Sequence, residues 1–412
     1  MGAAPLLHAF AGYGIELEYM IVDRHTLAVM PIADTLLQAA SGRPQADVDR
    51  GRFGWSNEIV LHLVELKNAR PDPALEPLAA GFQSEVHAIN RLLQPMGARL
   101  MPGAMHPWMN PAVETRLWPH DQAPIYQAYD RIFGCQQHGQ ANLQSMHLNL
   151  PFADDAEFAR LHAAVRLVLP ILPALAASSP FADGQASGFL DTRLANYCSA
   201  VQRVPSVIGQ VIPDTSNSRA EYASQVLAPM YRDIAPLDPQ GALQHEWLNA
   251  RGAIPRFDRN AIEIRVIDVQ ECPQADLAIA AAATAVVWAL YDAKWSPLAM
   301  QQAIATEHLV KILHACIRDA EQAVIDDAGY LQLLGIPERQ CQAGELWRHL
   351  IEQTALDRST QWGEPLRVML EQGPLARRIL RVLGKDHSNA HLQHVYRALC
   401  DCLETGRLFV NE

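Results

Sequence analysis

The chain has 412 residues, of which 49% are hydrophobic and 19% are charged, and its formal net charge is −12. This length and composition are typical of a globular protein with a large core, and they exclude a disordered or fibrous chain. The negative charge argues against a nucleic-acid-binding surface, because neutralising phosphates requires clustered Lys and Arg. It does not exclude ATP, since bound metal ions can balance the charge of a triphosphate.

The cysteines and the apolar runs indicate a cytoplasmic protein without a membrane partner. Seven cysteines at irregular spacing are typical of reduced thiols, and the first residues lack the basic start and long apolar stretch of a secretory signal. The run Ala278–Leu290 has 13 residues, fewer than the roughly 20 that cross a bilayer, so we expect a buried helix there. Cys400 and Cys402 are expected on another helix, one buried and one near the surface.

The first predicted strand covers Ile15–Val22 and carries two carboxylates on one face. Side chains two residues apart on a strand point the same way, so Glu16 and Glu18 share a face while Leu17 and Tyr19 point to the other. Taken alone, an E-x-E strand is more often a solvated surface than a site.

The second predicted strand, Ile59–Leu66, is nearly all apolar, with Glu58 at its start and Glu65 near its end. A buried carboxylate such as Glu65 must be paired or bind a metal. The two glutamates are seven residues apart, which on a regular strand places them on opposite faces. Both reach one site only if the strand has a bulge or Glu58 lies in the preceding turn. His62 shares the parity of Glu58 and is a rival ligand.

Two further predicted strands, Met146–Leu150 and Ile262–Ile267, repeat this pattern. His147 in the first, and Glu263 and Arg265 in the second, oppose apolar neighbours. Taken alone, His147 is more often a structural histidine, and Glu263 with Arg265 is as readily an ion-pair set between strands. If the strands are neighbours, however, their charged faces merge into one acidic surface that also contains His and Arg. Such a surface has the residue types of a site that binds metal ions and phosphate groups.

The character of the chain changes at about residue 270, from strands alternating with helices to helices almost throughout. We therefore predict an α+β fold, with a catalytic domain over residues 1–295 and a helical C-terminal region over 296–412 packed on it. The predicted helices of this part are Asp276–Ala293, Met300–Ala328, Ala343–Thr354, Leu375–Leu383 and His391–Thr405.

The charged strand faces have the chemistry of a site for divalent cations. Carboxylates are hard oxygen ligands suited to Mg²⁺, with Mn²⁺ as the alternative, and one imidazole among them is compatible with either ion. Such ions would bridge the phosphates of ATP, and Arg265 would add a fixed cation where the transferred phosphoryl group lies. The candidate metal ligands are Glu16, Glu18, Glu58, Glu65, His147 and Glu263.

The order and spacing of several motifs resemble those of a known family. GIELE, E-x6-E, M-H-L-N, the stretch ASSPFADGQASGFLDTR (Ala177–Arg193) and IEIRVID follow one another as in type 2 glutamate–cysteine ligases and related carboxylate–amine ligases. The resemblance covers about residues 11–295. It implies a glutamine-synthetase-like fold, in which a curved, mostly antiparallel sheet flanked by helices carries metals on its concave face.

The resemblance also implies roles for individual residues. The six candidate metal ligands match acidic and His positions of the family. Arg265 and Arg193 match arginines that contact phosphate or the acceptor carboxylate, and Arg256 is a weaker candidate for phosphate contact. Ser145 and Asn149 depart from the family, which usually has His and Gly at these positions.

The implied function is ATP- and Mg²⁺-dependent formation of an amide through an acyl phosphate, with small amino acids such as glutamate and cysteine as substrates. One alternative is a metal-dependent hydrolase of small amides or phosphate esters that uses the same acidic site. Another is a non-catalytic, ligand-binding relative. The sequence contains neither a G-x-x-x-x-G-K-[ST] loop nor a G-x-S-x-G elbow, so metals and arginines would hold ATP. A homo-oligomer is left open.

Overall fold

An eight-stranded sheet forms the centre of this computed structural model, which describes residues 6–354, 356–357 and 359–410. The strand order is β2-β3-β4-β1-β6-β10-β9, with β5 beside β1, and neighbouring strands pair antiparallel. Its strands are β1 (Gly14–Asp23), β2 (Asp47–Arg50), β3 (Phe53–Asn57), β4 (Leu63–Asn68), β5 (Ala98–Met101), β6 (Ser145–Pro151), β9 (Ala253–Arg256) and β10 (Ala261–Asp268). Two small two-stranded sheets are formed by β7 (Phe181–Ala182) with β8 (Gln185–Ala186), and by β11 (Val324–Ile325) with β12 (Cys341–Gln342).

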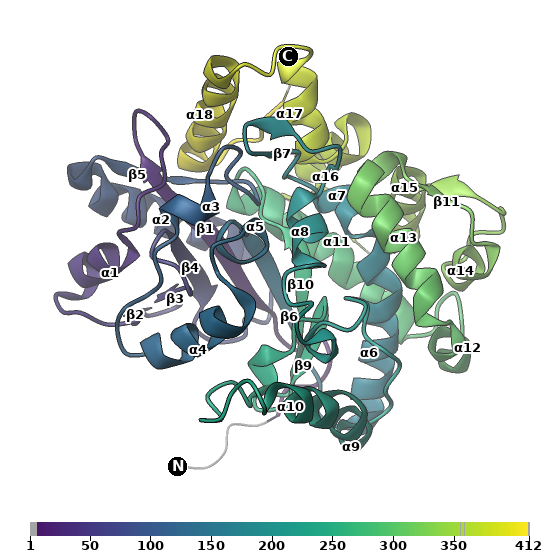
Figure 1. Ribbon diagram of the computed structural model, residues 1–412. Helices are drawn as coiled ribbons and strands as arrows, with labels where there is room; N and C mark the ends of the chain where they lie inside the picture. Colours follow the sequence, from purple (N-terminus) through teal and green to yellow (C-terminus); the bar gives the residue numbers. More distant parts are fainter. Residues whose placement is uncertain (1–5, 355, 358, 411–412) are drawn as a thin grey trace.

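Helices flank this sheet, which confirms the predicted α+β class (Figure 1). In the first part of the chain they are α1 (Ala33–Ser41), α2 (Glu76–Leu93), α3 (Pro111–Glu114), α4 (Ala123–Phe133), α5 (His138–Ala141), α6 (Asp155–Val168), α7 (Pro173–Ala176), α8 (Thr192–Tyr197), α9 (Arg219–Tyr222), α10 (Ala228–Ile234) and α11 (Pro273–Tyr291). They are followed by α12 (Leu298–Ala303), α13 (Thr306–Asp319), α14 (Ala328–Leu333), α15 (Ala343–Gln353), α16 (Gly363–Gln372), α17 (Leu375–Leu383) and α18 (Asn389–Thr405).

The apolar face of the sheet packs against α2, α6 and α11. Leu17 and Tyr19 of β1 are fully buried in one core cluster with Phe82 and Val86, which lie four residues apart on α2 and therefore on one side of that helix. Pro273 is suited to the first turn of α11, where its missing N–H leaves no hydrogen bond broken. Because alternate residues of a strand point to opposite faces, the charged side chains of these strands lie on the other face of the sheet.

Helix α11 is the apolar helix predicted around Ala278–Leu290. With 19 residues it is longer than the apolar run, and its length and composition alone would allow it to cross a membrane. However, 72% of its most apolar segment is buried inside the protein, as in the core helix of a globular protein. Cys400 and Cys402 lie on α18, the first buried and the second partly exposed, as predicted.

Two predicted boundaries are wrong. The second strand begins at Leu63 rather than Ile59, because the preceding residues pair with another segment: Leu61 N donates to Arg116 O, and Trp118 N donates to Ile59 O. The predicted helix Met300–Ala328 is divided into α12 and α13, and the backbone leaves the helical path at Ala320, whose φ is 49°. Beyond it, the strand β11 pairs antiparallel with β12, and α14 lies between them in the chain.

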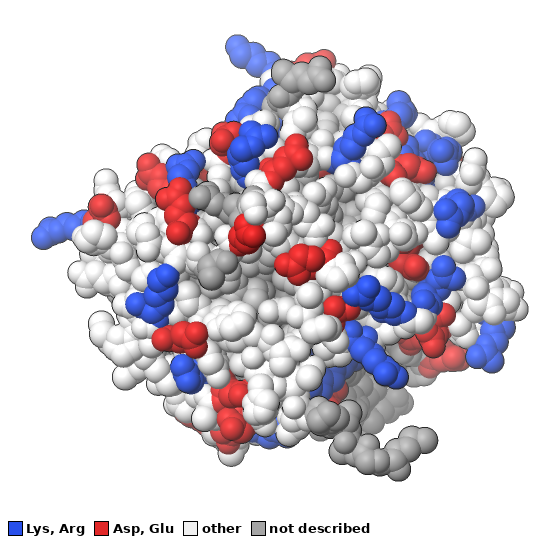
Figure 2. Space-filling view, turned by 180° about the vertical axis from the view of Figure 1, so that it is seen from behind, with Lys and Arg blue, Asp and Glu red and all other residues white. Residues whose placement is uncertain are grey.

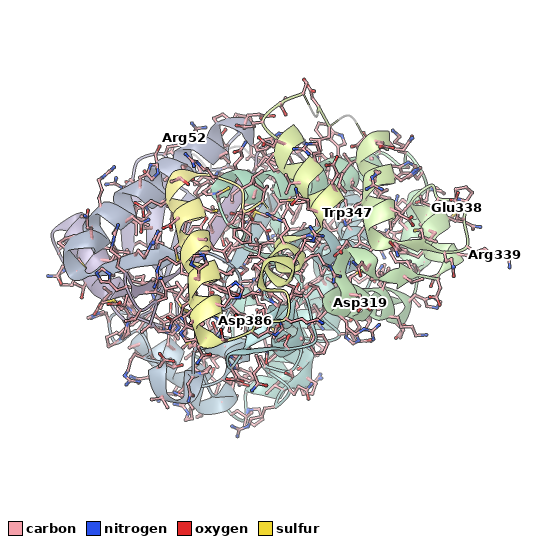
Figure 3. All side chains as sticks on the ribbon, turned by 90° about the horizontal axis from the view of Figure 1, so that it is seen from above. Arg52, Asp319, Glu338, Arg339, Trp347 and Asp386 are labelled. Atoms are coloured by element: carbon pink, nitrogen blue, oxygen red, sulfur yellow. The ribbon has the colours of Figure 1, made fainter. Side chains whose placement is uncertain are left out.

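The C-terminal helices share the core of the sheet. One continuous cluster of buried apolar residues includes Leu17 of β1, Leu313 of α13, Trp347 of α15 and Leu403 of α18. Figure 3 shows Trp347 in the interior, where its Nε1 donates to Ile171 O at 2.7 Å, whereas Glu338 and Arg339 lie at the periphery. The division into a domain over 1–295 and an appended region over 296–412 stays a prediction.

Candidate functional site

Four neighbouring strands bring the predicted carboxylates and the imidazole to one face of the sheet. In the register of β1 with its two neighbours, Glu18 lies opposite Glu65 of β4, and Glu16 lies opposite His147 of β6. Strand β10 continues the row, with Glu263 opposite Asn149. Because directly paired residues point to the same side of a sheet, these side chains share one surface. The predicted merging of the charged faces is confirmed.

His147 lies at the centre of this surface. Its Nδ1 is 2.8 Å from Glu16 Oε2 and 3.8 Å from Glu263 Oε1, and its Nε2 is 3.7 Å from Glu18 Oε1. Burial alone would lower the pKa of His147, but the surrounding carboxylates outweigh burial and raise the pKa to about 9. The surface therefore stabilises positive charge at this point.

The donor set fits divalent cations. Two groups, Glu16 with His147 and Glu263, and Glu18 with Glu65 and His147, have candidate ligand atoms that all lie within 4.8 Å of one another. Carboxylate oxygens with one imidazole are the ligands expected for Mg²⁺ or Mn²⁺ rather than for a structural zinc site.

Glu58 reaches the same surface because it lies outside the strand, as one of the two predicted options required. It follows Asn57, the last residue of β3, and lines one cavity with Glu18 and His147. Burial, and then the charges of Glu18 and Glu65, raise the pKa of Glu58 well above its usual value. A carboxylate in such a crowded position gains from a bound cation.

The rival ligand His62 does not belong to this surface. Its Nε2 lies 2.7 Å from Ala141 O, and burial lowers its pKa to about 4 despite that contact. His62 is therefore a neutral, structural histidine.

The three predicted arginines lie beside the carboxylates. Arg265 Nε is 2.8 Å from Glu263 Oε1, and Arg256 Nη1 donates to Glu263 Oε2 at 3.1 Å. Burial alone would raise the pKa of Glu263, but Arg265, His147 and Arg256 outweigh it and lower the pKa. Glu263 is therefore ionised and held between two guanidinium groups.

Arg193 is held from behind by a buried carboxylate. Its Nε donates to Asp268 Oδ1 at 2.5 Å, and Asp268 also accepts from Ser178 N and Ser179 Oγ at 2.8 and 2.9 Å. The Ser-Ser pair and Arg193 are the two ends of the stretch Ala177–Arg193, so the spacing of that stretch is what brings them to one carboxylate. Among the described residues, Arg193 Nη2 has no hydrogen-bond partner, although Arg193 is only 2% exposed.

A cavity of about 230 Å³ adjoins this surface, with Glu18, Glu58, His147, Arg193 and Arg265 on its polar side. Its other walls are largely aromatic and aliphatic and come from α4, α8 and the loop before β9. They include Tyr126, Tyr129, Tyr197, Trp247 and Leu248. Sequence reasoning placed none of these residues at the site; the stretch from Trp247 resembles a family motif only loosely, and no periodicity or motif marks the tyrosines.

Two polar residues of the surface were also missed. Ser56 of β3 and Lys67 of β4 both contact Glu65: Ser56 Oγ donates to Glu65 Oε1 at 2.7 Å, and Lys67 Nζ donates to the same oxygen at 3.0 Å. The signal for Lys67 was present, since a residue two positions after Glu65 shares its face.

The sequence matches the profile of glutamate–cysteine ligase family 2 (GCS2) over residues 13–398. The chain belongs to this family. The match extends well past the region of the motifs and includes most of the C-terminal helices. Membership of GCS2 indicates a glutamate–cysteine ligase-like enzyme.

Several relatives in this family are similar to the chain. A protein of Archaeoglobus fulgidus described as uncharacterised is 31% identical over 96% of this chain and 100% of its own length. A protein of Rubrobacter xylanophilus provisionally named glutamate–cysteine ligase 2-3 is 26% identical over 65% of this chain and 66% of its own length.

Solved structures share the fold. A glutamate–cysteine ligase of Francisella tularensis superposes with a TM-score of 0.55 at 13% identity, covering 95% of this chain and 89% of the ligase. A bifunctional glutathione synthetase of Pasteurella multocida superposes with a TM-score of 0.51 at 15% identity. The chain spans about half the length of that synthetase, 53%, and 95% of this chain is covered.

Figure 2 shows the molecule from behind relative to Figure 1, and on this face acidic and basic side chains are interspersed. No extended basic patch gathers among the described residues on that face.

Proposed function

We propose that the protein is an ATP- and Mg²⁺-dependent carboxylate–amine ligase that forms a γ-glutamyl-type amide. The observation that carries this proposal is the convergence of Glu16, Glu18, His147 and Glu263 from three strands beside a cavity that also contains Arg193 and Arg265. A free carboxylate is a poor electrophile, so amide synthesis in water needs activation. Acids and guanidinium groups on one surface suit phosphoryl transfer, which supplies that activation.

The proposed amide synthesis has two steps. An oxygen of the substrate carboxylate attacks the γ-phosphorus of ATP, the bond to the β-phosphate oxygen breaks, and ADP leaves. The amine nitrogen then attacks the carbonyl carbon of the acyl phosphate, the C–O bond to phosphate breaks, and inorganic phosphate leaves with one oxygen of the original carboxylate. The amine loses a proton in this step.

The divalent ions would be held by the acidic and imidazole side chains of the surface, and they would neutralise the charge that develops on the phosphates. The six proposed ligands are Glu16, Glu18, Glu58, Glu65, His147 and Glu263. Arg265 and Arg256, fixed on Glu263, would orient phosphate oxygens.

Arg193 would bind the substrate carboxylate. Its Nε is occupied by Asp268, while Nη2 is buried and free of protein partners among the described residues, so the guanidinium is fixed and still has a donor for a ligand in the adjoining cavity. Glutamate with cysteine is the simplest substrate pair. The Francisella ligase of similar fold was solved in complex with AMP, which supports a nucleotide substrate.

The arrangement favours a ligase over a metal-dependent hydrolase. Hydrolytic zinc sites normally use several imidazoles, whereas His62, the candidate for a second imidazole, contacts Ala141 instead. The full set of carboxylates and arginines also makes a non-catalytic relative the weaker alternative.

An isotope-transfer experiment tests the proposal. We expect that Mg²⁺-ATP, an amino acid labelled with ¹⁸O in its carboxylate, and an amine together release phosphate that carries one ¹⁸O, with an equal amount of amide detected by mass spectrometry. Glu16→Gln should abolish both products, because it removes a carboxylate next to His147. Glu352→Gln, on the exposed side of α15, is the matched control and should leave them unchanged.

Two outcomes would contradict the proposal. Amide or ester hydrolysis without ATP would favour the hydrolase, and failure to bind any nucleotide in the presence of Mg²⁺ would exclude the ligase.

A further inference from the structure

Lys67 is one of only four lysines in the chain, and it lies on the acidic face itself. On β4 it stands opposite Glu16 of β1, two residues beyond Glu65 and on the same side of the sheet. Its ammonium group donates to Glu65 Oε1 at 3.0 Å and to Ser56 Oγ at 2.8 Å. About a third of its side chain, 35%, is exposed.

Glu65 is therefore already neutralised by the protein. Its Oε1 accepts from both Lys67 and Ser56, so this oxygen carries two hydrogen bonds, one of them charge-assisted. The side chain of Asp47 on β2 also lies 3.4 Å from this ammonium group, but Asp47 is largely exposed, so Glu65 is the buried partner of Lys67. A divalent ion bound to Glu65 would lie close to the Lys67 ammonium and would be repelled by it.

The middle of the acidic face has a different balance of charge. At the opposite end, Glu263 lies between two arginines. Between the ends, Glu16 and Glu18 form ion-pair contacts with His147 alone among the described residues, and Glu58 forms none; the charges of His147 and Lys67 act on Glu58 from a greater distance. In the middle, three carboxylates thus have one imidazole in direct contact and, within the described part of the chain, neither an ammonium nor a guanidinium group.

We propose that Lys67 is a resident counter-ion that takes the place of one divalent metal, so that Glu65 is held by Lys67 rather than by an ion. This inference rests on the proposed function and refines its set of six ligands. Divalent ions then gather at the central carboxylates and His147. Lys67 acts here as a positioning residue, because it works through Glu65 and limits where metal binds.

Manganese binding to the purified full-length protein, without nucleotide, tests this role. Free Mn²⁺ is measured by electron paramagnetic resonance during titration, so the number of ions per chain is read without any assay of activity. We expect Lys67→Met to bind one more Mn²⁺ per chain than the wild type. Lys67→Arg keeps the positive charge and should bind the wild-type number, as should the control Lys311→Met on the exposed side of α13.

A second variant keeps the test decisive if Lys67→Met fails to fold. In the wild-type background, Glu65→Gln should leave the number of ions and their affinity unchanged, whereas loss of a true ligand would remove an ion or weaken its binding by about tenfold or more. Such a loss, or an unchanged count in a folded Lys67→Met, would overturn the inference while leaving the ligase proposal intact. No Mn²⁺ binding to the wild type would overturn both.

Discussion

The ion pair between Arg378 of α17 and Glu271, which follows β10, links the last helices to the end of the central sheet. Both side chains are fully buried, and Arg378 Nη1 and Nη2 donate to Glu271 Oε1 and Oε2 at 2.5 and 3.3 Å. Near the end of the chain, Phe409 O accepts from Arg378, and Phe409 N donates to Glu271. Replacing Arg378 by Met leaves the Glu271 carboxylate buried and without its cation.

The expected loss follows from the burial of the pair. Removing one partner of a buried ion pair costs about 3–5 kcal/mol, because the other charge keeps its desolvation penalty. At roughly 2.1 cal/mol/K per residue, the entropy of unfolding 412 residues is about 0.9 kcal/mol/K. Arg378→Met should therefore lower Tm by about 3–6 °C.

Thermal unfolding followed by tryptophan fluorescence measures this shift, and the double variant Arg378→Met/Glu271→Met is the control. Replacing both charges by apolar side chains should recover most of the loss, since neither charge then remains buried. A Tm of Arg378→Met within about 1 °C of the wild type, or a double variant less stable than the single one, would refute the reasoning.

Two further predictions concern histidines that lie outside the proposed site. Burial, with the charges of Arg166 and Arg251, lowers the pKa of His162 to about 3. The unfolded chain therefore binds a proton at His162 below about pH 6.5 while the native state does not. The native state loses stability as the pH falls from there, by up to about 1.4 kcal/mol per pH unit. His162→Phe should remove this loss, so the difference in Tm between the variant and the wild type should grow in favour of the variant as the pH is lowered from about 7 to about 4. A difference that stays constant would contradict the lowered pKa of His162. His62→Asn should keep the wild-type number of bound Mn²⁺ ions, because His62 contacts Ala141 O instead of the acidic surface, and a lost ion in the titration would restore His62 as a ligand.

The central part of the site could be predicted because strand parity is a local property. Glu16 and Glu18, two residues apart between apolar neighbours, had to share a face, and the same parity placed His147 and Glu263 opposite the core. The pairing of β1 with β6, and of β6 with β10, then brought these faces together. The parity conflict of Glu58 left two options, a bulge or a position in the preceding turn, and the structure places Glu58 between β3 and β4.

Other features depend on contacts between distant parts of the chain. The second strand starts late because residues near Ile59 pair with residues near Leu117, and no local pattern announces that partner. The aromatic walls of the cavity come from α4, α8 and the loop before β9, and α4 has the sequence of an ordinary amphipathic helix. Tyr126, for example, reaches the site only because α4 packs across the charged face, where its hydroxyl accepts from Asn57 Nδ2 at 3.1 Å.

Calorimetric titration of a non-hydrolysable ATP analogue is the most direct test of the central claim, that separate strands jointly bind divalent ions around a triphosphate. We predict binding in the presence of Mg²⁺, loss of at least tenfold in affinity when Mg²⁺ is chelated, and a similar loss in Glu18→Gln. Equal affinity with and without Mg²⁺, or undiminished binding to Glu18→Gln, would contradict the account.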